Sequence, residues 1–144
     1  MKALIDTCII IDALQSRKPF SDDAEKIFLA VSTNQCEGYI TAKEVTDIYY
    51  LTHHLLHSRE KTETIMNGLF TLFFVLDTCA KDAENAITSS LSDYEDAVMV
   101  ETAQREHMDC IVTRNIKDYK KAAIPVFAPA DFLTKICYKE PENL

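Results

Sequence analysis

The chain has 144 residues, of which 47% are hydrophobic and 26% are charged, as is usual for one soluble globular domain. Its 15 lysines and arginines stand against 23 aspartates and glutamates, and the net charge of −8 excludes attraction of nucleic acid by the overall electric field. A nucleic-acid partner would need a local basic patch or bridging metal ions, and only two glycines argue against an all-β fold with tight hairpins.

The chain begins with a short apolar run, residues 2–5, that ends at Asp6 and predicts a buried parallel strand. Ligands of open α/β sheets bind outside the carboxyl ends of the strands, so Asp6 stands where a functional site is expected. The alternative is that Asp6 caps the next helix, which is predicted over about residues 9–15. A second helix is predicted to begin at Ser21 as its N-cap, followed by acids that suit the helix dipole.

The second predicted strand covers residues 38–40 and is followed by Thr41, with Glu44 three residues later. This spacing is typical of a capping box at the start of a helix, here predicted to run to about residue 54. Glu44 therefore has a purely structural explanation available. Ser58 opens the following predicted helix.

The second half of the chain continues the alternation. Strands are predicted over residues 73–76, 110–112 and 124–127, and helices over residues 81–91, 93–107 and 129–136. This order predicts an α/β fold: a three-layer sandwich with a central, mostly parallel sheet of four to five short strands and helices on both faces. We expect one domain over residues 1–137 and a frayed polar tail over residues 138–144.

Polar residues gather after the predicted strands. They are Asp6, Glu44, Asn115 and Asp118. Right-handed crossovers bring the carboxyl ends of parallel strands to one edge, so we expect these side chains near each other. Asp93 and Asp96 begin the helix before residues 110–112, and topology alone does not place them at that edge.

Four stretches, taken in order, resemble a PIN domain, and their spacing resembles the VapC-like toxin branch of that family. They are residues 4–8 (LIDTC), 41–44 (TAKE), 93–97 (DYEDA) and 113–119 (TRNIKDY). The resemblance extends from residue 2 to about residue 132 and implies a PIN-like fold. It also implies a ribonuclease that uses Mg²⁺ or Mn²⁺ to cut RNA, a homodimer, and an inhibitory antitoxin partner that covers the acidic pocket.

The family's first three acids fall on residues that we therefore expect to be catalytic and to hold metal: Asp6, Glu44 and Asp96. The fourth falls on Asn115, which can offer a carbonyl oxygen to a hard cation but brings no charge. We include Asn115, Asp93 and Asp118 as candidate metal ligands, because either acid could replace the missing charge. We expect the first three acids to hold one ion and a second ion to arrive with RNA.

This chemistry suits the residue types, because a divalent ion held by carboxylates activates water and clamps phosphate oxygens. Three residues near the fourth acid position are candidates for substrate binding: Thr113, Arg114 and Lys117. Thr113 could bond Asp6 or simply end its strand, and Arg114 could contact phosphate or balance the acids as an ion pair. Lys117 belongs to a basic cluster that is either a solvated face or an RNA-contacting rim.

Asn115 leaves a second function open, namely a catalytically weak or inactive PIN-like module that binds RNA or a protein partner. A phosphoryl-accepting receiver domain shares the sheet and the acids, but it needs a lysine after its last strand that this chain lacks. The five cysteines form no C-x-x-C pair, which argues against zinc and favours reduced thiols in the cytoplasm. Asp6 and Asp12 interrupt the first apolar run, so we expect no signal peptide, and nothing reaches the length of a membrane span.

Overall fold

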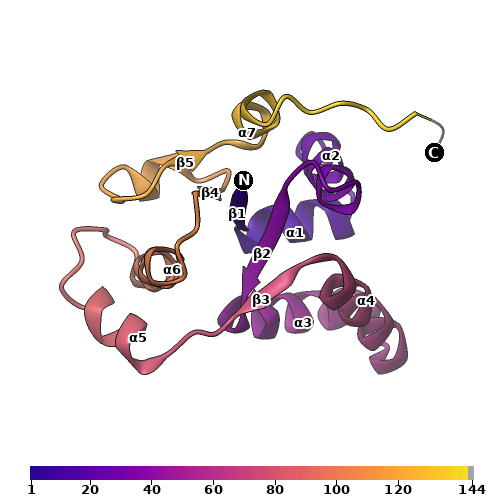
Figure 1. Cartoon of the computed structure of the whole chain (residues 1–144). Helices are drawn as coiled ribbons and strands as arrows, with labels where there is room; N and C mark the ends of the chain where they lie inside the picture. Colours follow the sequence, from indigo (N-terminus) through magenta and orange to yellow (C-terminus); the bar gives the residue numbers. More distant parts are fainter. Residues whose placement is uncertain (143–144) are drawn as a thin grey trace.

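A single sheet organises the computed structural model, which describes residues 1–142 (Figure 1). In the described residues its strands are β1 (Lys2–Ile5), β2 (Glu37–Thr41), β3 (Phe74–Leu76), β4 (Cys110–Val112) and β5 (Val126–Phe127). Their order is β3-β2-β1-β4-β5, and every neighbouring pair is parallel. The predicted α/β fold is confirmed, with a sheet that is wholly rather than mostly parallel.

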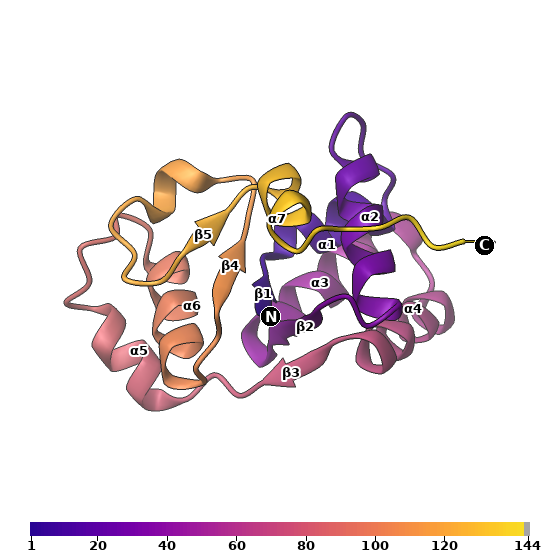
Figure 2. The ribbon, with the colours of Figure 1, turned by 45° about the horizontal axis from the view of Figure 1, so that its top comes forward.

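Helices cover both faces of this sheet (Figure 2). They are α1 (Thr7–Leu14), α2 (Ser21–Ser32), α3 (Ala42–Leu56), α4 (Arg59–Leu72), α5 (Ala80–Ala86), α6 (Tyr94–Arg105), α7 (Pro129–Lys135) and the 3₁₀ helix η1 (Ile116–Tyr119). Successive side chains of a strand point to opposite faces, and β1 shows this directly. Ala3 and Ile5 join the core formed with α1, α2, α3, α4 and α7, whereas Leu4 joins the core formed with α6.

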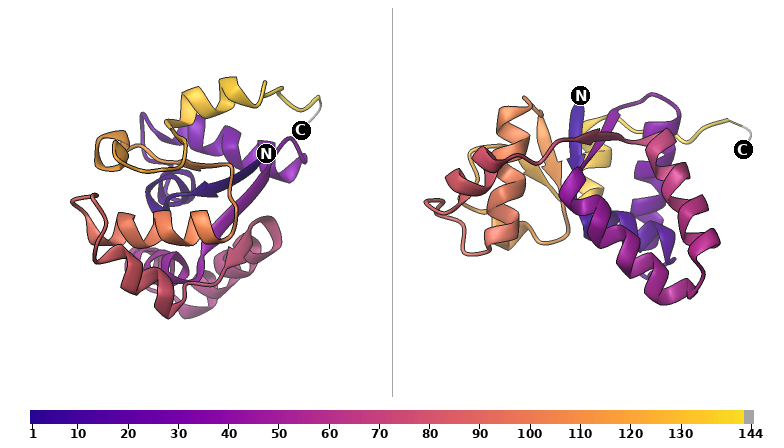
Figure 3. Two further views of the ribbon diagram at one scale, coloured as in Figure 1. Left: turned by 60° about the vertical axis from the view of Figure 1, so that its left-hand side comes forward. Right: turned by 90° about the horizontal axis from the view of Figure 1, so that it is seen from below.

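The topology brings the beginnings of α3 and α6 to one edge of the sheet (Figure 3). A helix that returns the chain between two parallel strands runs antiparallel to them, so it begins at their carboxyl ends. The helix α3 follows β2 directly, and α6 leads into β4. The strand order changes direction at β1, which is where α/β proteins bind ligands. The question that topology left open for Asp96 is thereby decided, because α6 begins at this edge.

Two apolar segments are less buried than predicted. The third strand was predicted as a buried run over residues 73–76, but β3 is an edge strand, and Phe74 and Val75 are 59% and 41% exposed. Phe73 is buried, but it closes α4 instead of pairing in the sheet. A helix was predicted over residues 81–91, but α5 ends at Ala86, and Ile87 directly after it is 73% exposed.

The start of one helix differs from prediction. Ser21 is the first residue of α2 rather than its N-cap, which is Phe20, and the buried Ser21 hydroxyl has no hydrogen-bond partner within residues 1–142. The tail is held at Lys139, whose backbone N–H donates to the Gln35 side chain at 2.8 Å while its carbonyl accepts from the Gln35 amide at 2.9 Å. The rest of the predicted tail includes residues 143–144, which lie outside the described residues. No helix in residues 1–142 has the length and apolar character needed to cross a membrane.

An ion pair fixes α5 against α6. The buried Asp82 accepts from Arg105 Nε at 2.8 Å and Nη2 at 2.9 Å, and from Thr102 Oγ1 at 2.8 Å. The Arg105 hydrogen bond, helped by further donors, lowers the pKa of Asp82 to about 2. This cluster holds the helix that carries Asp96 against its neighbour.

Arg105→Met is expected to destabilise the fold by about 3–5 kcal/mol, because it leaves the buried Asp82 carboxylate without its cation. Urea unfolding measures this change. Arg59→Met is the matched control, since the Arg59–Glu63 pair is exposed and should contribute less than about 1 kcal/mol. Equal losses in both variants would contradict a special role for the Asp82 pair.

Candidate active site

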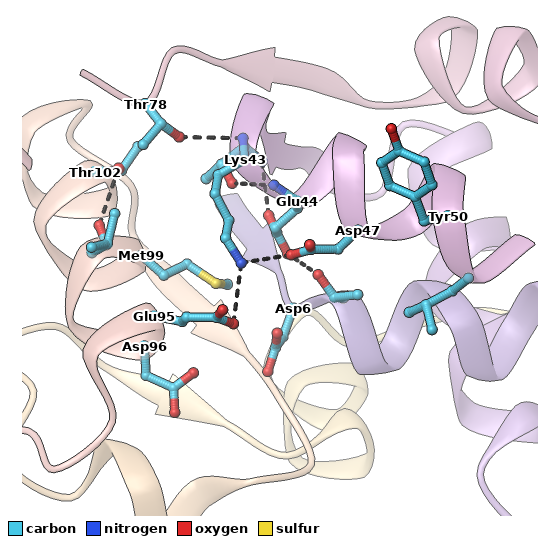
Figure 4. A pocket seen from close by; sticks show the side chains of 14 residues that line it. Asp6, Lys43, Glu44, Asp47, Tyr50, Thr78, Glu95, Asp96, Met99 and Thr102 are labelled. Carbon is cyan, nitrogen blue, oxygen red and sulfur yellow. Dashed lines mark hydrogen bonds and ion pairs between the residues drawn. The ribbon is translucent and has the colours of Figure 1, made fainter. Parts of the chain in front are cut away.

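A cleft of about 430 Å³ lies at the carboxyl edge of the sheet, between α3 and α6 (Figure 4). Its floor is Asp6 at the end of β1, one wall carries Glu44 on α3, and the other carries Asp96 on α6. The three acids that the PIN resemblance singled out therefore line one cleft, although they come from three separate elements.

Asp6 stands where β1 stops. Its backbone N–H still continues the sheet ladder by donating to the Val112 carbonyl at 2.9 Å. The carboxylate Oδ2 accepts from Thr113 Oγ1 at 2.7 Å and from the Cys8 thiol at 3.6 Å. Asp6 is the N-cap residue of α1, as the structural alternative predicted, but its side chain makes no capping hydrogen bond and is left to the cleft. Thr113 bonds Asp6, which confirms one of the two alternatives for Thr113.

Burial is the main cause that raises the pKa of Asp6, and the hydrogen bonds from Thr113 and Cys8 only partly oppose it. Burial, together with the negative charge of Asp6, raises the pKa of the Cys8 thiol to about 11, so the thiol stays protonated and can donate. Asp6 is thus held in place by two neutral donors without gaining a full counter-charge.

Glu44 forms the capping box of α3 and also lines the cleft. Its Oε2 accepts from the Thr41 backbone N–H at 2.8 Å, and the Thr41 hydroxyl accepts from the Glu44 N–H at 3.1 Å, which is the predicted capping box. The Thr7 hydroxyl donates to Oε1 at 3.2 Å. Glu44 is 3% exposed, and burial followed by the charge of Asp6 raises its pKa to about 8.

Asp96 is oriented by a residue that the sequence did not reveal. The buried Tyr119 hydroxyl donates to Asp96 Oδ1 at 2.9 Å. Burial first, and then the charges of Asp93, Asp6 and Asp118, raise the pKa of Asp96 to about 6, while the Tyr119 hydrogen bond lowers it. Burial and the neighbouring acids raise the pKa of Tyr119, so its hydroxyl keeps the proton it donates.

The other predicted metal ligands lie outside the cleft lining. Asp93 is exposed and caps α6, accepting from the Asp96 backbone N–H at 3.0 Å. Asp118 and Asn115 are exposed in and before η1. The charges of Asp93 and Asp118 still reach Asp96, because both raise its pKa. The structure thus brings three acids together and places two more at their margin.

Arg114 has a partner that the sequence did not suggest. Its Nε and Nη2 lie 2.6 and 3.2 Å from the two carboxylate oxygens of the fully buried Asp12, and its guanidinium lies 4.0 Å from the centre of the Phe20 ring. The ion-pair alternative for Arg114 is the one the contacts support, with Asp12 rather than with the cleft acids. Lys117 is exposed. Substrate binding by Thr113, Arg114 and Lys117 stays a prediction.

The donor set of the cleft suits a hard divalent cation. Carboxylate oxygens are the preferred ligands of Mg²⁺ and Mn²⁺, and the raised pKa values of Asp6, Glu44 and Asp96 reflect acids buried without enough positive charge. A bound cation would supply that charge. Within residues 1–142, no three histidine, cysteine or acidic side chains already converge closely enough to hold an ion, so the carboxylates would have to draw inward.

Three charged residues of the cleft were missed by sequence reasoning, and one of them is Asp47, a turn beyond Lys43 on α3. The other two are Lys43 and Glu95, and each directly precedes one of the predicted acids in the chain. The available signal was their position in the first turn of their helices. Helical phase alone could not show that the two turns face each other across a cleft.

Comparisons with known proteins show the family and the fold of the chain. The sequence model described as PIN domain matches residues 2–117. A search of curated proteins found no significant match. Among solved structures, a chain of a toxin–antitoxin complex from Klebsiella pneumoniae is 24% identical with a TM-score of 0.64, covering 88% of this chain and 97% of that chain.

Two further solved structures share the fold at lower identity. VapBC2 from Rickettsia felis, bound to a DNA fragment from their promoter, is 15% identical with a TM-score of 0.66, covering 89% of this chain and 98% of that chain. VapC20 from Mycobacterium tuberculosis, described as a sarcin–ricin loop cleaving toxin, is 11% identical with a TM-score of 0.59, covering 76% of this chain and 86% of that chain. Since the family match spans residues 2–117, the chain belongs to the PIN domain family.

Proposed function

We propose that this chain is a metal-dependent endoribonuclease that hydrolyses RNA phosphodiester bonds with Mg²⁺ or Mn²⁺, as the toxin of a type II toxin–antitoxin pair. The observation that carries the proposal is the convergence of Asp6, Glu44 and Asp96 on one cleft, each with a raised pKa. Membership of the PIN family and the fold shared with a toxin described as cleaving the sarcin–ricin loop support it.

Three acids would hold the metal ion in this proposal, and two neighbouring hydroxyl groups would orient them. A bound divalent ion lowers the pKa of a water molecule and neutralises charge on the reacting phosphate. Asp6, Glu44 and Asp96 would hold it as ionised carboxylates. Thr113 and Tyr119 fix two of these carboxylates through the hydrogen bonds to Asp6 and Asp96.

The margin of the cleft supplies further charge. Asp93 and Asp118 add negative potential at Asp96, which partly offsets the uncharged Asn115 at the fourth acid position. We assign these three residues to a second ion that needs RNA phosphate as an additional ligand. Arg114 and Lys117 would contact phosphates of the RNA backbone outside the cleft.

The proposed partners follow from the fold shared with solved toxin–antitoxin complexes. We propose a cognate antitoxin that covers the acidic cleft, and a homodimer that acts in the cytoplasm. Size-exclusion chromatography at high concentration tests the homodimer, and a monomer alone would contradict it.

Removal of the metal is expected to abolish RNA cleavage. Purified protein with Mg²⁺ or Mn²⁺ should cut RNA, excess EDTA should stop the reaction, and Asp6→Asn should be inactive with metal present, because the ion loses a charged ligand. Gel analysis of a labelled RNA measures the products. Asp131→Asn, an exposed change of the same type on α7, is the control that should keep full activity. Cleavage that persists in EDTA or in Asp6→Asn would overturn the proposal.

A catalytically weak PIN module that binds RNA or a protein is the second candidate. It is favoured by the exposed position of Asn115 and by carboxylates that do not yet converge on an ion within residues 1–142. Calorimetry with Mn²⁺ separates the two functions. Heat of binding that disappears in Asp6→Asn supports the nuclease, whereas no binding by the folded parent protein supports the weak module.

A further inference from the structure

One cation lies among the acids of the cleft. Among residues 1–142, Lys43 is the single lysine or arginine in its lining, and its Nζ lies 2.6 Å from Asp47 Oδ2 and 3.1 Å from Glu95 Oε2. Asp47 lies one turn further along α3, whereas Glu95 belongs to α6 on the opposite wall. Figure 4 shows the Lys43 side chain reaching across the cleft above Asp6 to Glu95.

The contacts that hold Lys43 are suited to exchange. The side chains of Lys43, Asp47 and Glu95 are 38%, 42% and 72% exposed. Ion pairs with this exposure are weak, typically worth less than about 1 kcal/mol. A phosphodiester anion that enters the cleft can therefore replace Glu95 at Nζ at little cost, and two of the three ammonium donors are then available to it while one stays with Asp47.

The charge of the cleft favours a cation that helps the metal ions to attract RNA. Besides the three proposed metal ligands, Asp47 and Glu95 add two more acids to the lining, and the chain as a whole carries a net charge of −8. Repulsion of a polyanion must be overcome locally, because the overall field gives no attraction. Lys43 is positioned beside the acids that would face the scissile phosphate.

We propose that Lys43 is a substrate-binding residue whose ammonium group binds an RNA phosphate in the cleft. The ion pair with Glu95 competes with that phosphate and thereby limits RNA affinity. The inference rests on the proposed RNA substrate. The competing explanation is a structural one, in which Lys43 only links α3 to α6. The two differ in what they predict for salt dependence and for the Glu95 variant.

The first measurement is fluorescence anisotropy with a labelled single-stranded RNA of mixed sequence, in the Asp6→Asn background with Mg²⁺ so that the probe stays intact. Lys43→Gln is expected to raise Kd about tenfold and to reduce the slope of log K against log salt by about 0.7, the contribution of one phosphate contact on a single strand. Lys61→Gln, an exposed lysine on α4, should change neither value. Unchanged Kd and slope in Lys43→Gln would overturn the inference.

The second measurement tests the restraint by Glu95. Glu95→Gln is expected to lower Kd about threefold, as expected when one weak ion pair no longer competes with the phosphate. The gain should largely vanish when Lys43→Gln is also present. Glu101→Gln on the same helix is the control for loss of one negative charge. An equal gain with and without Lys43 would show that Glu95 acts by repulsion alone, and an unchanged or higher Kd in Glu95→Gln would overturn the restraint by Glu95.

These outcomes are separable from failure of the proposed function. If the parent protein binds RNA through Lys43 but never cuts it, the nuclease proposal fails and the role of Lys43 stands. If it cuts RNA and Lys43→Gln binds as tightly as the parent, the nuclease stands and the role of Lys43 fails. If the chain with Lys43 intact binds no RNA, the role of Lys43 is overturned whatever the activity.

Discussion

Replacement of Asp96 by asparagine is expected to lower RNA cleavage by more than about a hundredfold, and Tyr119→Phe is expected to lower it about tenfold. Loss of a charged metal ligand should lower the cleavage rate more than loss of the group that orients this ligand. Such orienting groups typically contribute about 10–100-fold to activity or metal affinity. Tyr119 donates to Asp96 Oδ1 at 2.9 Å, so phenylalanine keeps the packing of the ring and removes only the hydrogen bond. Single-turnover cleavage at saturating metal measures both effects.

The pH profile shows whether Tyr119 acts through Asp96. The Tyr119 hydrogen bond lowers the pKa of Asp96, against burial that raises it to about 6. Its removal should therefore raise that pKa, and the acid limb of the rate profile should move to higher pH in Tyr119→Phe. Tyr94→Phe is the matched control, because Tyr94 begins α6, the helix of Asp96, and its hydroxyl donates to the Ala83 carbonyl on α5 instead of to Asp96. A uniform loss of rate without a pH shift would mean that Tyr119 is structural only.

The metal-free protein is expected to become less stable as pH rises from about 5 to about 8, on the order of a few kcal/mol. Burial and the charge of Asp6 raise the pKa of Glu44 from 4.5 to about 8 in the folded state. The folded chain then holds a proton that the unfolded chain releases. The stabilisation is full below the unfolded pKa and is lost as pH rises through the folded pKa. Asp96, with a folded pKa of about 6, adds to the effect in the lower part of this range.

Urea unfolding in EDTA across this pH range measures the loss. Glu44→Gln should remove most of it, because glutamine is neutral and can still accept from the Thr41 N–H in the capping box. Glu60→Gln, an exposed change on α4, should keep the parental pH dependence. Added Mg²⁺ should reverse the trend, since an ion that binds the ionised acids stabilises the folded state more at higher pH. An identical pH dependence in Glu44→Gln would refute this account.

The sequence by itself determined the features that depend on neighbours along the chain. The alternation of short apolar runs with helical periods predicted the parallel sheet, because period and length are local properties. The Thr41–Glu44 capping box spans four residues and formed as predicted. Asp6 was found from the end of its strand, and the PIN resemblance selected Asp96 among several acids. These three acids line the cleft together.

Tertiary structure alone decided the contacts between residues far apart in the chain. Arg114 and Asp12 are separated by 102 positions, and Tyr119 and Asp96 by 23, so no local pattern relates them. Lys43 meets Glu95 only because crossovers place α3 and α6 at the same edge of the sheet. The exposure of β3 likewise depends on its place at the sheet edge, which its apolar sequence does not reveal. The strength and direction of these contacts are set by packing, and packing is a property of the whole fold.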